Sequence, residues 1–205
     1  MQPIFNKEEQ LAEQILKVLE GRPSNDNKFS WKEIVLMVKQ QLALQIKINL
    51  FTNYKMGEAI NPGQYLVTFE DVPVKTNTSR NRDYIDLPAR FVDLPGGKGV
   101  WSIGPMGNDW DKFIPLKAGA SNFGRIHNVP FLQDNVGYEV EGMQAMFTKD
   151  LIDNGLTTCL VQLVTTDAVV LNITQDMDSA VIRGVLEILG AEAPSDKVDD
   201  NNEAR

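Results

Sequence analysis

Apolar positions in the first quarter of the chain recur at the spacing of helices. Residues 7–20 carry an apolar side chain every three or four positions, and Gly21 follows as a left-handed terminator. A second run starts at Ser30 and Glu33, which form a capping-box pattern, and it continues without Gly or Pro until Gly57. The pattern predicts two helices, and the second is about 26 residues and about 40 Å long.

The long predicted helix carries more apolar side chains than one stripe can hold. One stripe comprises Trp31, Ile34, Val35, Val38, Leu42, Ile46 and Phe51. The apolar residues that fall outside it are Leu36, Leu44, Ile48 and Leu50. A helix that is apolar on more than one side needs partners on more than one side. Subunit–subunit packing through this helix is therefore one hypothesis.

After residue 57 the pattern changes to the alternation and turn signals of β-strands. The segments with this pattern are 64–74, 84–97, 99–107, 138–148 and 156–166. Prolines in the second and third indicate edge or bent strands. The last two segments are predicted to pair across the turn sequence "DNG" at 153–155, although the connection is longer than two residues.

Helical spacing returns near the C-terminus, over about residues 179–189, with Asp176 or Asp178 as the cap and Gly190 as the end. The fold class predicted is α+β: N-terminal helices including one long helix, a small bent antiparallel β-region and a C-terminal helix. The regions expected are a helical 1–57, a β-rich 58–175, the helix 176–190 and an acidic, disordered tail 191–205.

A glycine-rich run, "LPGGKGVWSIGPMG" at 94–107, raises the question of phosphate binding. Gly99 and Gly104 have the spacing of a phosphate-binding loop, but Pro and Met follow where that loop needs Lys and then Ser or Thr. The glycines are instead predicted to form bends and bulges of the β-region, with Trp101 and Ile103 on one face of a short strand.

The composition provides few residues that could form a catalytic site. Any Ser-His-Asp or Cys-His set must use His127, the single histidine, which has no serine elbow beside it. Cys159, the single cysteine, lies in an apolar segment and is predicted to be buried. The acidic residues are too scattered to predict a metal site. No cofactor is expected, and an enzyme with two carboxylates that meet only in the fold stays as an alternative.

Charge and hydropathy indicate which classes of binding partner and which compartment to expect. The formal net charge of −8 repels phosphate backbones, which argues against a dedicated nucleic-acid-binding face. Lysines and a glutamate interrupt residues 31–51, so no membrane-crossing helix is expected. The N-terminus lacks the pattern of a secretory signal. The single cysteine fits a reducing compartment such as a cytoplasm.

Residues 84–116, "YIDLPARFVDLPGGKGVWSIGPMGNDWDKFIPL", carry a resemblance to a known group. They resemble neck proteins of tailed bacteriophages, in which a Leu-Pro leads through a Gly turn to a "GVWSI"-like strand and then to a Phe-Ile contact segment. Segments 155–167 and 179–190 follow in the order expected of that group. The group that the chain resembles most is the ring-forming head-to-tail connector proteins of crAss-like phages.

The resemblance implies a non-enzymatic virion protein, assembled in the bacterial host cytoplasm as a homo-oligomeric ring between portal and tail. Its expected partners are copies of itself, the portal, other neck or tail proteins, and passing DNA that it does not bind specifically; no membrane is expected. The alternative is another phage tail or adaptor module that forms no ring. Candidate subunit-interface residues are Leu44, Ile48, Phe51, Trp101, Trp110 and Phe113.

Overall fold

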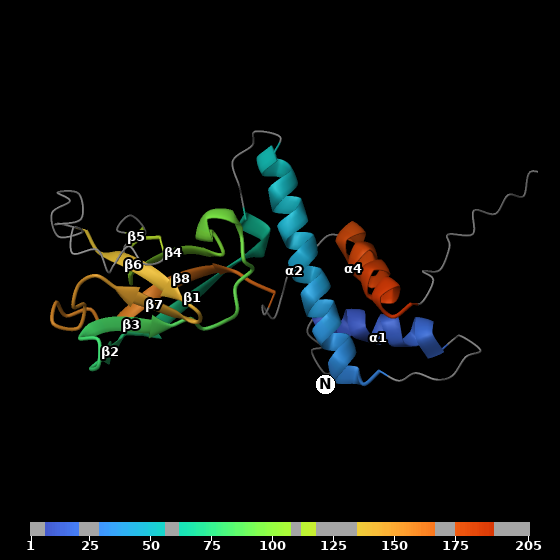
Figure 1. Ribbon diagram of the computed structural model, residues 1–205, viewed down its shortest axis with the longest axis horizontal. Coiled ribbons are helices and arrows are strands. Elements are labelled where there is room, and N and C mark those ends of the chain that lie inside the picture. Colours follow the sequence, from blue (N-terminus) through green and yellow to red (C-terminus); the bar gives the residue numbers. More distant parts are fainter. Residues whose placement is uncertain are drawn as a thin grey trace, which may run out of the picture. The chain divides into compact units, whose positions relative to one another are not determined.

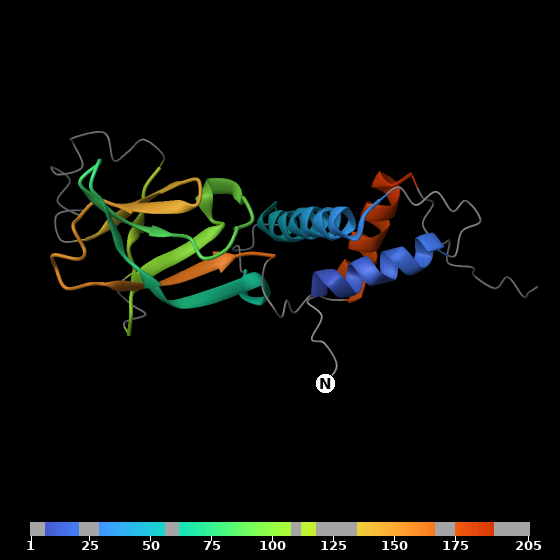
Figure 2. The ribbon, with the colours of Figure 1, turned by 90° about the horizontal axis from the view of Figure 1, so that it is seen from below.

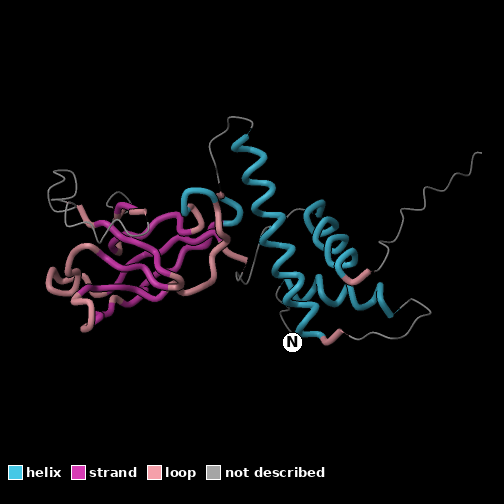
Figure 3. The backbone as a smooth tube through the Cα atoms, viewed as in Figure 1, coloured by secondary structure: helices cyan, strands magenta, loops and turns pink. Residues whose placement is uncertain are grey.

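The computed structural model describes residues 7–20, 29–55, 62–107, 112–117, 135–166 and 175–190. Their fold is mixed α+β, as the sequence predicts (Figures 1 and 3). The helices are α1 (Lys7–Glu20), α2 (Trp31–Lys55) and α4 (Gln175–Ile188). The strands are β1 (Leu66–Pro73), β2 (Lys75–Asn77), β3 (Arg82–Asp86), β4 (Val100–Pro105), β5 (Ile114–Pro115), β6 (Gly137–Glu141), β7 (Gln144–Phe147) and β8 (Thr158–Val164).

These elements form two compact units. The helical unit spans Met1–Ile48 and Val169–Arg205, and so contains α1, α4 and most of α2. The β-unit spans Asn49–Ala168 and contains all the described strands together with the last residues of α2. Within the β-unit, Asn49 Nδ2 donates a hydrogen bond to the Tyr65 hydroxyl at 2.8 Å, which fastens the end of α2 to the start of the strands.

Both shorter helices occur where helical spacing predicts them. Leu11 and Ile15 of α1 are fully buried, whereas Gly21 lies outside the described residues. Helix α4 begins at Gln175, earlier than expected, so the prediction that Asp176 or Asp178 caps it is wrong. Both aspartates lie in its first turn, where a negative side chain interacts favourably with the exposed N–H groups of the helix. The predicted disordered tail 191–205 also lies outside the described residues.

The strands form two sheets. The three-stranded sheet has the order β1-β8-β4, and the five-stranded sheet has the order β2-β3-β7-β6-β5. Every named pair is antiparallel except β5 and β6, which are parallel, so the predicted antiparallel β-region is mixed at this one edge. Strand β4 is an edge strand of its sheet, as its proline predicts.

The strands of the β-unit lie together in one group (Figure 2). Backbone hydrogen bonds link the two sheets at two margins, and the sheets share one core. At one margin the chain passes from β1 to β2 through Val74, whose N–H donates to Thr157 O at 2.9 Å. At the other, the Phe113 N–H donates to Ile103 O at 2.8 Å and links the β5 segment to β4. The two sheets therefore enclose one shared core. This core comprises Val72, Val74, Ile85, Leu87, Val100, Ile103, Phe113, Tyr138, Ala145, Phe147, Leu151, Cys159, Val161 and Leu163.

The predicted hairpin across 153–155 is wrong. Segment 138–148 is two strands, β6 and β7, which pair with each other, while β8 pairs with β1 and β4 in the other sheet. A buried carboxylate holds the turn between β7 and β8. Asp83 of β3 accepts hydrogen bonds from the N–H groups of Leu151 (2.7 Å) and Ile152 (2.9 Å), and this holds the turn that precedes β8.

The glycine-rich run forms bends, as predicted. Gly96 and Gly97 have φ values of 74° and 73°, the left-handed region that favours glycine. Gly99 meets a different requirement, because a Cβ there would lie 2.2 Å from the carbonyl oxygen of Val92. Three glycines of the run are thus explained by one turn of the backbone, at Gly96 and Gly97, and by one close approach between chain segments, at Gly99.

The strand that follows the glycines contains a β-bulge. Val100 and Ser102 pair with consecutive residues of β8, so Trp101 is the extra residue between them. The prediction that Trp101 and Ile103 share a face is therefore wrong. Val100 and Ile103 belong to the core, whereas Trp101 stays partly exposed outside it.

Candidate interaction surface

The candidate surface lies on α2, and local sequence determines where that helix starts. The Ser30 N–H donates to the Glu33 carboxylate at 2.7 Å, and the Glu33 N–H donates to Ser30 Oγ at 3.4 Å. These bonds confirm the predicted capping box. The backbone and side-chain hydrogen bonds from Ser30 hold the pKa of Glu33 below its usual value. The capping box therefore determines where α2 begins.

One side of α2 is buried along a strict four-residue spacing. Leu50, predicted to lie outside the buried stripe, is 3% exposed and continues it. Trp31 and Phe51, predicted to lie within it, are each 39% exposed. Four residues make slightly more than one helical turn, so a stripe with this spacing winds slowly around the helix. Trp31 and Phe51, the first and last residues of the predicted stripe, therefore lie outside the buried one. The fully buried members are Ile34, Val38, Leu42 and Ile46.

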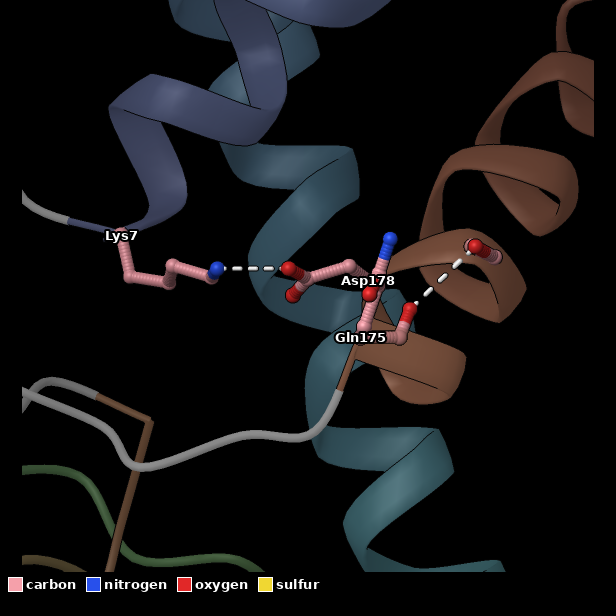
Figure 4. Close-up of polar contacts among 4 residues, drawn as sticks. Lys7, Gln175 and Asp178 are labelled. Atoms are coloured by element: carbon pink, nitrogen blue, oxygen red, sulfur yellow. Dashed lines mark hydrogen bonds and ion pairs between the residues drawn. The ribbon is translucent and has the colours of Figure 1, made fainter.

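Polar contacts tie α1 to both other helices of the helical unit. The Lys7 ammonium lies 2.6 Å from Asp178 Oδ2, an ion pair between α1 and α4 (Figure 4). Within α4, Ser179 Oγ donates to the carbonyl oxygen of Gln175 at 3.2 Å. On the side of α2, Lys39 Nζ lies 3.6 Å from a Glu8 carboxylate oxygen. The buried stripe of α2 is therefore held by helices that are also joined to one another.

Close packing brings α4 against α2. A Cβ on Gly184 would lie 2.6 Å from Gln41 Oε1, so the absence of a side chain on α4 makes room for the glutamine of α2. The apolar residues of α4 that are buried in the unit are Met177, Val181, Val185 and Leu186. One side of α2 is thus covered by the chain itself.

The opposite side of α2 carries an exposed apolar stripe, which we call the outer stripe: Leu36, Gln40, Leu44 and Ile48. Each member lies two positions after a buried residue, a rotation of about 200° around the helix. Leu36, Leu44 and Ile48 are 52%, 45% and 49% exposed. Three large apolar side chains on one exposed helix face are typical of a protein–protein contact. Of the predicted interface residues, Leu44 and Ile48 are in this stripe.

The other predicted interface residues differ in their surroundings. Phe51 is exposed and lies seven positions after Leu44 and three after Ile48, on the same side of α2 as the outer stripe, with the Lys55 ammonium 4.8 Å from the centre of its ring. Trp101 is the partly exposed bulge residue of β4. Trp110 lies outside the described residues. Of the predicted interface residues, Leu44, Ile48 and Phe51 thus share one side of α2, whereas Trp101 belongs to the β-unit.

Phe113 is a core residue rather than an interface residue. It is 9% exposed and packs edge-to-face on Phe147, with ring centres 5.5 Å apart and planes at 78°. Its side chain has no face left for a neighbouring subunit, so this assignment is corrected. Leu36 was not among the residues predicted for the interface. It lies eight positions before Leu44, and so belongs to the same four-residue spacing as the rest of the outer stripe.

Of the two candidates for chemistry, Cys159 and His127, the structure describes only Cys159. Cys159 is fully buried, as predicted, and burial raises the pKa of its thiol to about 12. A thiol in that state is inert, because the thiolate is the nucleophile. His127 lies outside the described residues. Within the described ranges, no group of three or more His, Cys, Asp or Glu side chains could hold a metal ion.

Helix α2 passes a simple test for a membrane span. Residues Trp31–Thr52 form a 22-residue segment with mean hydropathy 1.2, long and apolar enough to cross a bilayer by length and composition. The exclusion drawn from its charged residues was therefore too strong. The core helix of a globular domain passes the same test, and the buried stripe of α2 has that character, so the segment by itself favours neither interpretation.

The fold and this surface define an α+β protein with two units: a helical unit packed around the buried stripe of α2, with the outer stripe exposed, and a β-unit in which two sheets share one core. No protein-family model matches the chain, and no curated protein matches it either.

Proposed function

We propose that this chain is a self-assembling structural subunit, a non-enzymatic component of an oligomeric ring of the head-to-tail connector type in a phage virion. The observation that carries the proposal is the outer stripe of α2. An apolar helix face opposite a fully packed one has a physical reason to exist if another protein surface covers it. The resemblance of residues 84–116 to neck proteins supplies the virion setting.

A comparison of free energies indicates that the outer stripe is one part of a larger subunit interface. Covering three half-exposed apolar side chains stabilises an interface by about 3 kcal/mol, taking about 1 kcal/mol for half of each side chain. Association costs roughly 4–15 kcal/mol in lost translational and rotational freedom. A ring also uses two different surfaces on each subunit, since its contacts are head-to-tail. The stripe therefore supplies one half of the contact, and a second region of a neighbouring copy supplies the other.

The charge of the chain fits a subunit that surrounds DNA without gripping it. A net charge of −8 disfavours adhesion of a phosphate backbone to the channel wall. Copies of this chain, the portal and other neck or tail proteins are the partners that this role requires. The ring would assemble in the bacterial cytoplasm and remain in the virion.

The test is the oligomeric state of the full-length protein. We expect light scattering after gel filtration, native mass spectrometry and negative-stain microscopy to show a closed ring, alone or on addition of the portal. The double variant Leu44→Glu, Ile48→Glu should dissociate it and keep the helical circular dichroism signal. Gln14→Glu, on an exposed position of α1, adds charge outside the stripe and should leave assembly unchanged.

Three results would count against the proposal. A monomer at every concentration, even beside its portal, would exclude ring formation and favour an adaptor module. A double variant that assembles as well as the native chain would remove the outer stripe from the contact. If the native chain floated with liposomes and the double variant did not, the outer stripe would be shown to contact lipid instead of protein.

A further inference from the structure

The β-unit contains a cavity with the size of a small-molecule site. Its volume is about 520 Å³, within the range of about 300–1,000 Å³ that such sites occupy. Apolar side chains form most of its wall, and they come from separate parts of the chain: Phe91, Val100, Leu116 and Val140. Val100 belongs to the core itself, and Phe91 and Val140 pack against it, so these walls are rigidly supported.

Tyr138 of β6 also lines this cavity, and the residue as a whole is 2% exposed. Within the described part of the chain, no residue forms a hydrogen bond with its hydroxyl. Buried tyrosine hydroxyls usually have a hydrogen-bond partner. Burial raises the pKa of Tyr138 to about 12, so the group keeps its proton at neutral pH. It can therefore donate a hydrogen bond to an acceptor that enters the cavity.

One cation lies beside the same cavity. Lys117 follows β5, is exposed, and forms no ion pair with any residue in the described ranges. A lysine lets its methylene stem lie along apolar surface while the ammonium stays in water. The cavity thus combines an apolar interior with one positive charge on its exposed side.

The glycine-rich run contributes backbone to this wall. Gly96 and Gly97 line the cavity, and a Cβ on either would meet nothing within 4 Å. The turn that the sequence uses to change direction is therefore also the place where the cavity wall carries no side chain. Among the described residues that line the cavity, Lys117 is the one cation, which disfavours a phosphate group.

We propose that this cavity binds a small amphipathic acid, with its apolar body among the four apolar side chains and its single anionic group near Tyr138 and Lys117. The Tyr138 hydroxyl donates to the anion, and the Lys117 ammonium attracts it. No residue of the outer stripe lines the cavity, so this proposal does not rest on ring formation.

A matched pair of probes separates the apolar and the ionic contributions. Anilinonaphthalene sulfonate and phenylnaphthylamine share one aromatic body, and only the first carries an anion. We expect the sulfonate to bind one molecule per chain and the neutral probe to bind more weakly. Backbone amide resonances of Gly96, Gly97 and Val140 should shift on titration with either probe.

Charge and hydroxyl variants have matched controls in the same unit. Lys117→Glu should weaken sulfonate binding about fivefold or more and leave the neutral probe unchanged. Lys112→Glu makes the same charge change at an exposed position outside the cavity and should alter binding by less than about twofold. Tyr138→Phe should weaken the sulfonate about threefold, whereas Tyr84→Phe, outside the cavity, should not.

Occupation of the cavity itself is tested by Val140→Trp, which should abolish binding of both probes by filling the space. If that variant does not fold, the lysine pair decides. If Lys117→Glu and Lys112→Glu weakened sulfonate binding equally, the proposal would be overturned, because the effect would then come from the overall charge of the protein and not from a site. Loss of binding in the outer-stripe double variant, with no shift at Gly96 or Gly97, would overturn it as well.

Discussion

The ammonium of Lys7 and a carboxylate oxygen of Asp178 lie 2.6 Å apart, although the two residues are separated by 171 positions in the sequence. The two side chains are 26% and 21% exposed, so water screens this pair less than it screens a surface pair. The second carboxylate oxygen of Asp178 is buried and accepts no hydrogen bond within the described residues. The pair therefore joins the first helix of the helical unit to the last, and one of its charges depends on the other.

We expect Lys7→Met to lower the free energy of unfolding of the helical unit by about 1–2 kcal/mol, since it leaves a largely buried carboxylate without its cation. Lys17→Met is the matched control. Lys17 pairs with Glu13 on the same helix at 2.9 Å, but the side chains are 69% and 48% exposed. That change should cost about 0.3–0.5 kcal/mol. Urea unfolding followed by circular dichroism measures both, and equal effects would contradict the assigned role of Lys7.

Two glycine positions in the same run should respond differently to alanine. Gly99→Ala would bring a Cβ 2.2 Å from the Val92 carbonyl oxygen. The Val92 N–H is bonded to Val164 O at 2.7 Å, so this backbone cannot move away freely. We expect a loss of about 3 kcal/mol. Gly96→Ala enters open space and should cost only the strain of a left-handed backbone, about 1 kcal/mol. Thermal unfolding of the two variants side by side checks the order.

The buried carboxylate of Asp83 should contribute strongly to the β-unit. It accepts from the N–H groups of Leu151 and Ile152 and from Thr76 Oγ1, the last at 2.7 Å. Asp83→Ala leaves buried donors without an acceptor, so we expect a loss of about 3 kcal/mol. Asp153→Ala, exposed on the same turn, should change stability by less than about 0.5 kcal/mol. Similar denaturation midpoints for the two variants would show that the turn does not need its acceptor.

The thiol of Cys159 should react only when the β-unit opens. Burial raises its pKa from 9.0 to about 12, so the folded state retains the thiol proton where the unfolded state has lost it. This contribution to stability is complete below about pH 9 and is lost as the pH rises towards 12. Iodoacetamide labelling at pH 8 should therefore be slow in buffer and fast in urea. Cys159→Ala should flatten the alkaline decline in stability, and rapid labelling of the folded chain would contradict the burial argument.

Local sequence was sufficient for the helices because their signals lie within a few residues of one another. Ser30 and Glu33 are three positions apart, and their mutual hydrogen bonds start α2 where the pattern predicts. The turns at Gly96 and Gly97 were equally local. The end of the α2 stripe was less certain, because Leu50 and Phe51 are neighbours and the winding of the stripe decides which of them is buried.

Strand pairing was beyond the sequence because its partners are distant. Nothing near residues 151–155 indicates that Asp83 holds their backbone, so a hairpin was the natural and mistaken interpretation. The bulge at Trp101 likewise shifts the register by one residue, and a shift of one residue exchanges the faces of a strand.

The sequence by itself determined the α+β class, the limits of α1, the start of α2 and the burial of Cys159, because each follows from spacing, capping or composition within a short segment. Only the tertiary structure decided that the outer stripe of α2 stays uncovered by the helical unit, that Phe113 is in the core, and that Tyr138 and Lys117 line one cavity. Those facts depend on segments far apart in the chain meeting in space, and neither helical nor strand periodicity carries that information.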